Sequence, residues 1–101
     1  MRMVVKIFGV GTQEVLAIDE EKSICNFNGK LIKVDVPKIL QEILNVLAGA
    51  NEVMVDEFII DGTTYIFDIE NNGKTRRYYF KNAFPKGFES IVNIIGGLKR
   101  C

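Results

Sequence analysis

The fold of this chain is decided by residues 63–81, TTYIFDIENNGKTRRYYFK, where two alternating runs flank Asn72-Gly73. An Asn-Gly pair between such runs is the strongest short signal for a β-hairpin, because both turn residues must adopt positive φ. A two-residue turn also fixes the strand register, so that Phe67 lies opposite Tyr78. We therefore expect a hairpin whose two strands share one aromatic face.

A second turn signal, Asp61-Gly62, extends this hairpin into a predicted three-strand meander. The expected strands are Val53–Ile60, Thr63–Glu70 and Lys74–Lys81. Side chains alternate between the two faces of a strand, so the register assigns each residue to a face. The face predicted to pack in the core consists of Phe58, Ile60, Tyr65, Phe67, Ile69, Tyr78 and Phe80.

The first third of the chain predicts two more hairpins. Gly9-Val10-Gly11 and Asn28-Gly29 both supply residues that tolerate the positive φ of a tight turn. The strands that these turns connect are Arg2–Phe8 with Gln13–Ile18, and Lys22–Phe27 with Lys30–Val34.

Two segments predict amphipathic helices. Asp35 suits a helix N-cap, Pro37 suits the first turn, and apolar residues then recur at helical spacing before Gly49. A closing helix is expected after Asn82–Pro85 and before Gly96-Gly97. The apolar stripe of this closing helix consists of Phe88, Ile91, Val92 and Ile95.

These elements predict a single α+β domain over residues 1–101. An antiparallel sheet with one apolar face buries that face best when amphipathic helices pack against it. The expected architecture is therefore an antiparallel β-sheet made of two N-terminal hairpins and the meander, with both helices packed on one face.

Composition excludes most catalytic chemistries. The chain has no histidine, and its two cysteines do not form a CxxC pair. Ser-His and Cys-His nucleophile pairs, histidine acid–base chemistry and the commonest zinc ligands are therefore absent. Gly9-x-Gly11 lacks the third glycine of a phosphate loop, and the acids at 19–21 lack the ligand spacing of a calcium loop. We expect no enzyme activity, no cofactor and no metal.

Residues 74–81, KTRRYYFK, combine basic and aromatic side chains that can hold phosphates and stack on bases. The strand period divides this stretch, because it turns Tyr78 and Phe80 toward the core. The neighbouring strand is acidic and would repel a phosphate backbone. Nucleic acid is therefore not the expected partner, and single-stranded nucleic-acid binding through Arg76–Lys81 stays an alternative.

The face of the sheet away from the helices is the predicted functional site. Ile66 and Tyr79 lie there among charged residues, a combination typical of protein interfaces. Together with the loop Asn82–Gly87, this face is expected to bind another protein. The predicted binding residues are Ile59, Ile66, Asp68, Glu70, Arg77, Tyr79, Lys81, Phe84 and Lys86.

Other uses of the sheet surface stay open. The N-terminal strands could cover this face, or the face could carry a few exposed apolar residues without a function. A second copy of the chain could bury it as a homodimer. A free edge strand could also accept an extended segment of a partner.

Targeting signals are not expected in this chain. Met1–Val10 lacks the apolar stretch and cleavage site of a secretory signal, and no apolar run approaches the ~20 residues that cross a bilayer. We therefore expect no membrane partner and a cytoplasmic location. Cys25 lies in an apolar strand and is expected in the core, whereas Cys101 is expected to be exposed.

The hydrophobic pattern resembles the emfourin family of small bacterial inhibitors of thermolysin-like metalloproteases. The parts that carry the resemblance are Met1–Gly9 (MRMVVKIFG), the helix Pro37–Gly49 and the segment Thr64–Ile95. The C-terminal pattern is also similar to small proteins of low-GC bacteria, and phage-borne inhibitors such as anti-CRISPR proteins use comparable α+β folds. The resemblance implies a small inhibitor and carries over no inhibitory residue. We predict a protein that binds another protein, as an inhibitor or adaptor, by occlusion.

Overall fold

The computed structural model describes residues 1–58 and 62–101, which contain seven strands and two helices. The strands are β1 (Arg2–Gly9), β2 (Thr12–Asp19), β3 (Ile24–Phe27), β4 (Lys30–Leu31), β5 (Val53–Val55), β6 (Thr64–Asn71) and β7 (Lys74–Lys81). The helices are α1 (Val36–Leu47) and α2 (Glu89–Lys99).

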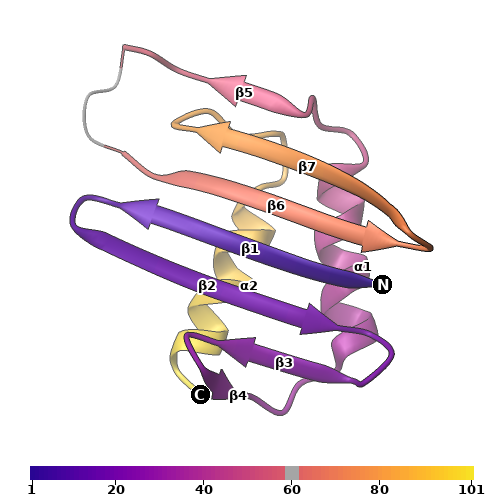
Figure 1. Cartoon of the computed structure of the whole chain (residues 1–101). Helices are drawn as coiled ribbons and strands as arrows, with labels where there is room; N and C mark the ends of the chain where they lie inside the picture. Colours follow the sequence, from indigo (N-terminus) through magenta and orange to yellow (C-terminus); the bar gives the residue numbers. More distant parts are fainter. Residues whose placement is uncertain (59–61) are drawn as a thin grey trace.

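The strands form one sheet in the order β4-β3-β2-β1-β6-β7-β5. Neighbouring strands are antiparallel, except that β5 runs parallel to β7. Figure 1 shows both helices behind this sheet, on the same side of it. The chain therefore has an α+β fold with a mostly antiparallel sheet.

The β6–β7 hairpin has the predicted register. Asn72 and Gly73 form its turn with φ of 53° and 77°, the left-handed values that an Asn-Gly turn requires. Phe67 pairs with Tyr78 as expected. The aromatic side chains of both strands therefore share one face.

The N-terminal strands extend the same sheet. β1 pairs antiparallel with β6 over seven residue pairs, with Val5 opposite Phe67. β1 and β2 form one hairpin, and β3 and β4 form another around Asn28 and Gly29, whose φ values are 52° and 86°. Because β1–β4 lie in the plane of the sheet, the alternative in which the N-terminal strands cover its face is wrong.

The predicted three-strand meander is wrong at its first strand. β5 contains only Val53–Val55 and lies beside β7 instead of β6. A strand has two edges, and β1 and β7 occupy both edges of β6. β1 brings the buried side chains of Met3, Val5 and Ile7 to the core, so its pairing with β6 buries a larger apolar area than β5 offers.

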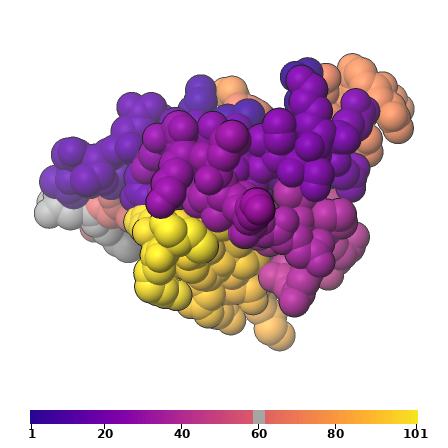
Figure 2. Space-filling view, turned by 90° about the horizontal axis from the view of Figure 1, so that it is seen from below, coloured from indigo at the N-terminus to yellow at the C-terminus, as the bar shows by residue number. Residues whose placement is uncertain are grey.

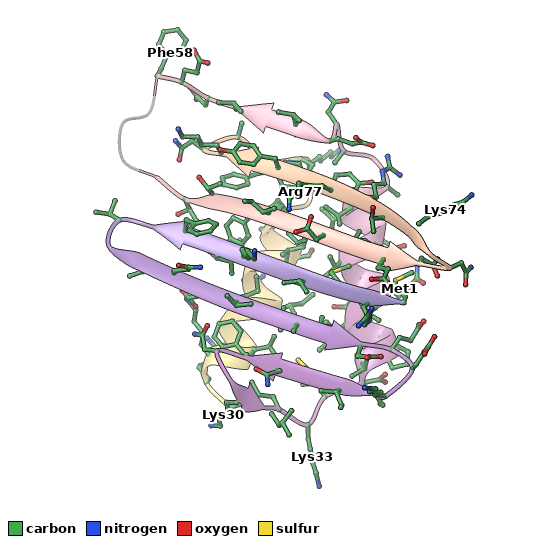
Figure 3. All side chains as sticks on the ribbon, in the orientation of Figure 1. Met1, Lys30, Lys33, Phe58, Lys74 and Arg77 are labelled. Atoms are coloured by element: carbon green, nitrogen blue, oxygen red, sulfur yellow. The ribbon has the colours of Figure 1, made fainter. Side chains whose placement is uncertain are left out.

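Phe58 is exposed, although the meander places it in the core. The chain turns after β5, where Asp56 Oδ1 accepts a hydrogen bond from the Phe58 backbone N–H at 3.0 Å. Phe58 is 97% exposed and projects from the sheet edge beyond β5 (Figure 3). The predicted positions of Ile59, Ile60 and Asp61 lie outside the described residues.

α1 follows its sequence signals. Asp35 accepts a hydrogen bond from the Lys38 backbone N–H at 3.2 Å, and Pro37 occupies the first turn. The buried stripe of the helix consists of Val36, Leu40, Ile43 and Leu47.

α2 continues through Gly96 and Gly97, where the sequence predicts its end. Each glycine inside a helix costs about 1 kcal/mol relative to alanine. The last turn buries Leu98, and burial of a leucine contributes about 1.5–3 kcal/mol, which offsets this cost. Val92 is exposed at the surface, outside the buried stripe in which the sequence places it.

The core lies between the sheet and the helices. Figure 2 shows the two layers from below, with the N-terminal strands in indigo and purple above α2 in yellow. Phe67 and Phe80 are fully buried, with ring centroids 5.8 Å apart. Phe88, which precedes α2, packs edge-to-face on Phe80 of β7, with ring centroids 5.7 Å apart. This contact joins the helix layer to the sheet.

The substitution Phe67→Ala tests this core. It is expected to lower the free energy of unfolding by about 3–5 kcal/mol, because it leaves a cavity among buried rings. Phe58→Ala is the matched control and should change this value by at most about 0.5 kcal/mol, since its ring contacts solvent. Guanidinium unfolding followed by circular dichroism measures both variants. Equal losses would contradict the observed positions of the two phenylalanines.

Candidate functional site

The outer face of the sheet is the side away from the helices. No helix in the described ranges lies over it (Figure 1). The strand pairings place on it Arg2, Val4, Lys6, Phe8, Gln13, Val15, Ala17, Asp19, Ile24, Asn26, Leu31, Val53, Val55, Thr64, Ile66, Asp68, Glu70, Thr75, Arg77, Tyr79 and Lys81. This face is therefore broad, and it combines apolar, aromatic and charged side chains.

A central row crosses the outer face from β2 to β5. Its members lie side by side in the order Val15, Lys6, Ile66, Tyr79 and Val53. All except Val53 are half-buried by neighbouring side chains alone. The row therefore presents packed apolar and aromatic surface to solvent, with one ammonium group within it.

Two arginine–carboxylate pairs lie beside the central row. Arg77 donates to both carboxylate oxygens of Asp68, at 2.6 and 3.0 Å. Arg2 donates to both carboxylate oxygens of Glu70, at 3.0 Å each. These hydrogen bonds favour the charged form and raise the pKa of Arg77 and of Arg2. Because the pairs are exposed, they orient the four side chains more than they stabilise the fold.

Two lysines of the outer face have no ion pair within residues 1–58 and 62–101. Lys6 lies between Val15 and Ile66, so its aliphatic stem packs on apolar side chains. Lys81 lies beside Thr64 of β6. Among the described residues, the arginines of this face are therefore paired with carboxylates, whereas Lys6 and Lys81 are not.

The structure brings six of the predicted binding residues onto the outer face: Ile66, Asp68, Glu70, Arg77, Tyr79 and Lys81. The predicted Ile59 lies outside the described residues. Phe84 stacks on Phe88 with ring centroids 4.6 Å apart, on the helix side of the sheet, and Lys86 follows it in the same loop. The loop after β7 therefore does not adjoin the outer face, contrary to the expectation of one continuous surface.

Sequence reasoning missed the contribution of β1 and β2 to the outer face. Val4, Lys6 and Phe8 lie on this face, while Met3 and its alternate neighbours are buried on the other. The sequence of β1 contains a signal for this contribution, because apolar residues stand at both odd and even positions of the strand. Such a pattern indicates a strand with apolar surface on both faces.

The basic–aromatic stretch of β7 is divided between the two faces. Arg76 lies over the ring of Tyr78 at 4.9 Å and donates to Glu52 Oε1 at 2.9 Å. Arg77 points to the outer face, where it binds Asp68. The two arginines therefore do not form one cationic patch.

In the part of the chain that the structure describes, no three His, Cys, Asp or Glu side chains come together as metal ligands. No helix in that part is long and apolar enough to cross a membrane.

Comparison of the chain with protein-family models, with curated proteins and with solved structures found no match.

The two thiols are expected to differ in reactivity. Cys25 is buried, and this burial raises the pKa of its thiol, which reduces the thiolate fraction at any given pH. Cys101 is exposed. Ellman's reagent at about pH 8 should therefore modify Cys101 rapidly and Cys25 only after unfolding. In the Cys101→Ser variant, rapid modification of the native protein would contradict the buried position of Cys25.

Proposed function

We propose that this chain is a protein without catalytic activity that binds another protein through the outer face and acts as an inhibitor or adaptor by occlusion. The observation that carries the proposal is the central row, a packed apolar and aromatic strip that no element of the described chain covers. The two cysteines of the chain, Cys25 and Cys101, are free thiols, which is consistent with a reducing cytoplasm.

The chemistry of the outer face supports a protein partner. Tyr79 and Arg77 belong to the residue types that most often dominate binding energy at interfaces, and Ile66 adds apolar contact area between strands. The molecule extends 40 × 29 × 21 Å, and a standard interface occupies about 800 Å² on each partner. The outer face is large enough for an interface of that size.

Lys6 and Lys81, which form no ion pair with the residues that the structure describes, indicate the charge of the partner. Covering Lys6 with an apolar surface would remove water from an ammonium group and cost stability unless a carboxylate replaced that water. We therefore expect the partner to place acidic side chains opposite Lys6 and Lys81, and apolar side chains opposite Ile66 and Tyr79.

A second copy of this chain fits the face less well. In a face-to-face dimer, the carboxylates available to Lys6 would come from the same outer face of the other copy. Of the carboxylates on this face, Asp68 and Glu70 already accept two hydrogen bonds each from arginines, and Asp19 accepts one from the Lys22 backbone N–H. A partner with free carboxylates satisfies the lysines without breaking those pairs.

Site-specific photo-crosslinking tests the proposal. A photo-reactive phenylalanine analogue replaces Tyr79 on the outer face, or Glu42 on the exposed surface of α1 as the control, in cells that carry the gene. We expect a protein crosslinked from position 79 and not from position 42. The identified protein is then purified, and its Kd for the unlabelled chain is measured by calorimetry.

Substitutions decide whether that complex uses the outer face. Tyr79→Ala and Lys6→Glu should each weaken binding by at least about tenfold, or about 1.4 kcal/mol, whereas Glu42→Lys should change Kd by less than about twofold. An unchanged Kd in both face variants would overturn the proposal. Crosslinking only to a second copy, with dimers that Lys6→Glu dissociates in sedimentation, would replace it by the homodimer.

A further inference from the structure

The two edges of the sheet differ in how they are protected. At the β4 edge, Lys30 and Lys33 project from the sheet, as Figure 3 shows. Charged side chains, and lysine above all, discourage the addition of another strand to an edge. At the β5 edge, residues 51–58 contain no lysine or arginine, and Val53 and Val55 are 65% and 42% exposed. Leu31 of β4 is also exposed, at 69%, so the two edges differ in their charge: lysines at β4, and carboxylates without a base at β5.

The backbone of β5 presents hydrogen-bonding groups on the side away from β7. Glu52 C=O accepts from Tyr79 N–H at 2.7 Å, and Asp56 N–H donates to Lys81 C=O at 2.9 Å. In a parallel pair, alternate residues bond to the same neighbour, so Met54 also faces β7. The N–H and C=O groups of Val53 and Val55 consequently point away from β7, and they have no partner in the described ranges.

We propose that the open edge of β5 binds an extended segment of a partner protein, which adds a strand to the sheet. The backbone groups of Val53 and Val55 supply the hydrogen bonds, and their exposed side chains lie beside apolar side chains at alternate positions of the segment. Phe58, almost fully exposed at the end of this edge, supplies an aromatic anchor.

The charge of the edge determines the chemistry of the segment. Glu52, Asp56 and Glu57 flank the two valines, and only Glu52 forms an ion pair within the described residues. A segment with Lys or Arg beside its apolar residues therefore complements this edge. Antiparallel pairing of β5 with β5 of a second copy, centred on Met54, would place Glu52 opposite Asp56, and such like charges are destabilising.

This inference does not rest on the proposed function of the outer face. Strand addition depends on the backbone groups of Val53 and Val55, and the side chain of Val53 is all that it shares with the central row. The variants Tyr79→Ala and Lys6→Glu leave the Val53 and Val55 backbone groups in place. Failure of either proposal can therefore be recognised separately.

Two synthetic peptides, KKVTVTVKK and EEVTVTVEE, test the proposal on the intact chain. Amide chemical shifts of the ¹⁵N-labelled protein are followed during titration of each peptide to about 1 mM. With the basic peptide, the largest shifts are expected at Val53, Val55 and Phe58, together with slower hydrogen exchange at the two valines. The acidic peptide should bind at least about tenfold more weakly, and added salt should weaken the basic peptide.

Edge variants give the matched controls. Val55→Pro removes an outward N–H without removing a bond to β7, and should abolish binding of the basic peptide. Leu31→Pro removes the equivalent outward N–H at the β4 edge and should leave binding unchanged, because Ile32 N–H carries the bond to Cys25 C=O. Glu57→Lys keeps the backbone intact and should weaken binding about tenfold, so the charge argument is tested even if a proline variant fails to fold.

Specific outcomes would overturn the proposal. Absence of shifts at Val53 and Val55, equal binding of both peptides, or largest shifts at the β4 edge would each exclude a basic segment at β5. Concentration-dependent shifts at the same amides without peptide would assign the edge to a second copy of the chain instead.

Discussion

The pairing of β1 with β6 is the constraint on which the rest of this structure depends. It joins the N-terminal hairpins to the C-terminal hairpin in one sheet, with Val5 beside Phe67 at the centre of the core. This pairing places the odd-numbered side chains of β1 against the helices and the even-numbered ones on the outer face. It also occupies the second edge of β6, so β5 is left to pair with β7 at the end of the sheet.

The same constraint creates two surfaces of different physical character. The outer face is a side-chain surface, in which arginines paired with carboxylates flank a central row that contains Lys6, a residue without an ion pair in the described part of the chain. The β5 edge is a backbone surface, where the N–H and C=O groups of Val53 and Val55 have no partner among residues 1–58 and 62–101 and lie among carboxylates. The first favours an acidic partner surface and the second a basic extended segment, so opposite charges distinguish the two kinds of contact.

Much of the candidate site could be predicted because strand alternation and a two-residue turn act locally. The Asn72-Gly73 turn places Asp68 opposite Arg77, and the structure shows these two side chains in contact. The position of Phe84 could not be predicted in this way, because its stacking on Phe88 depends on where α2 packs. The place of Lys6 in the central row could not be predicted either, because it depends on which strand pairs with β6.

The sequence by itself determined the hairpin turns, the cap of α1 and the face to which each side chain of β6 and β7 points. These features depend on residues within a few positions of one another, and backbone sterics and local hydrogen bonds decide them. Only the tertiary structure decided the neighbours of β6, the exposure of Phe58 and the extension of α2 through its glycines. Distant segments compete for the same edges and the same core, and the arrangement that buries the most apolar surface prevails over the local signals.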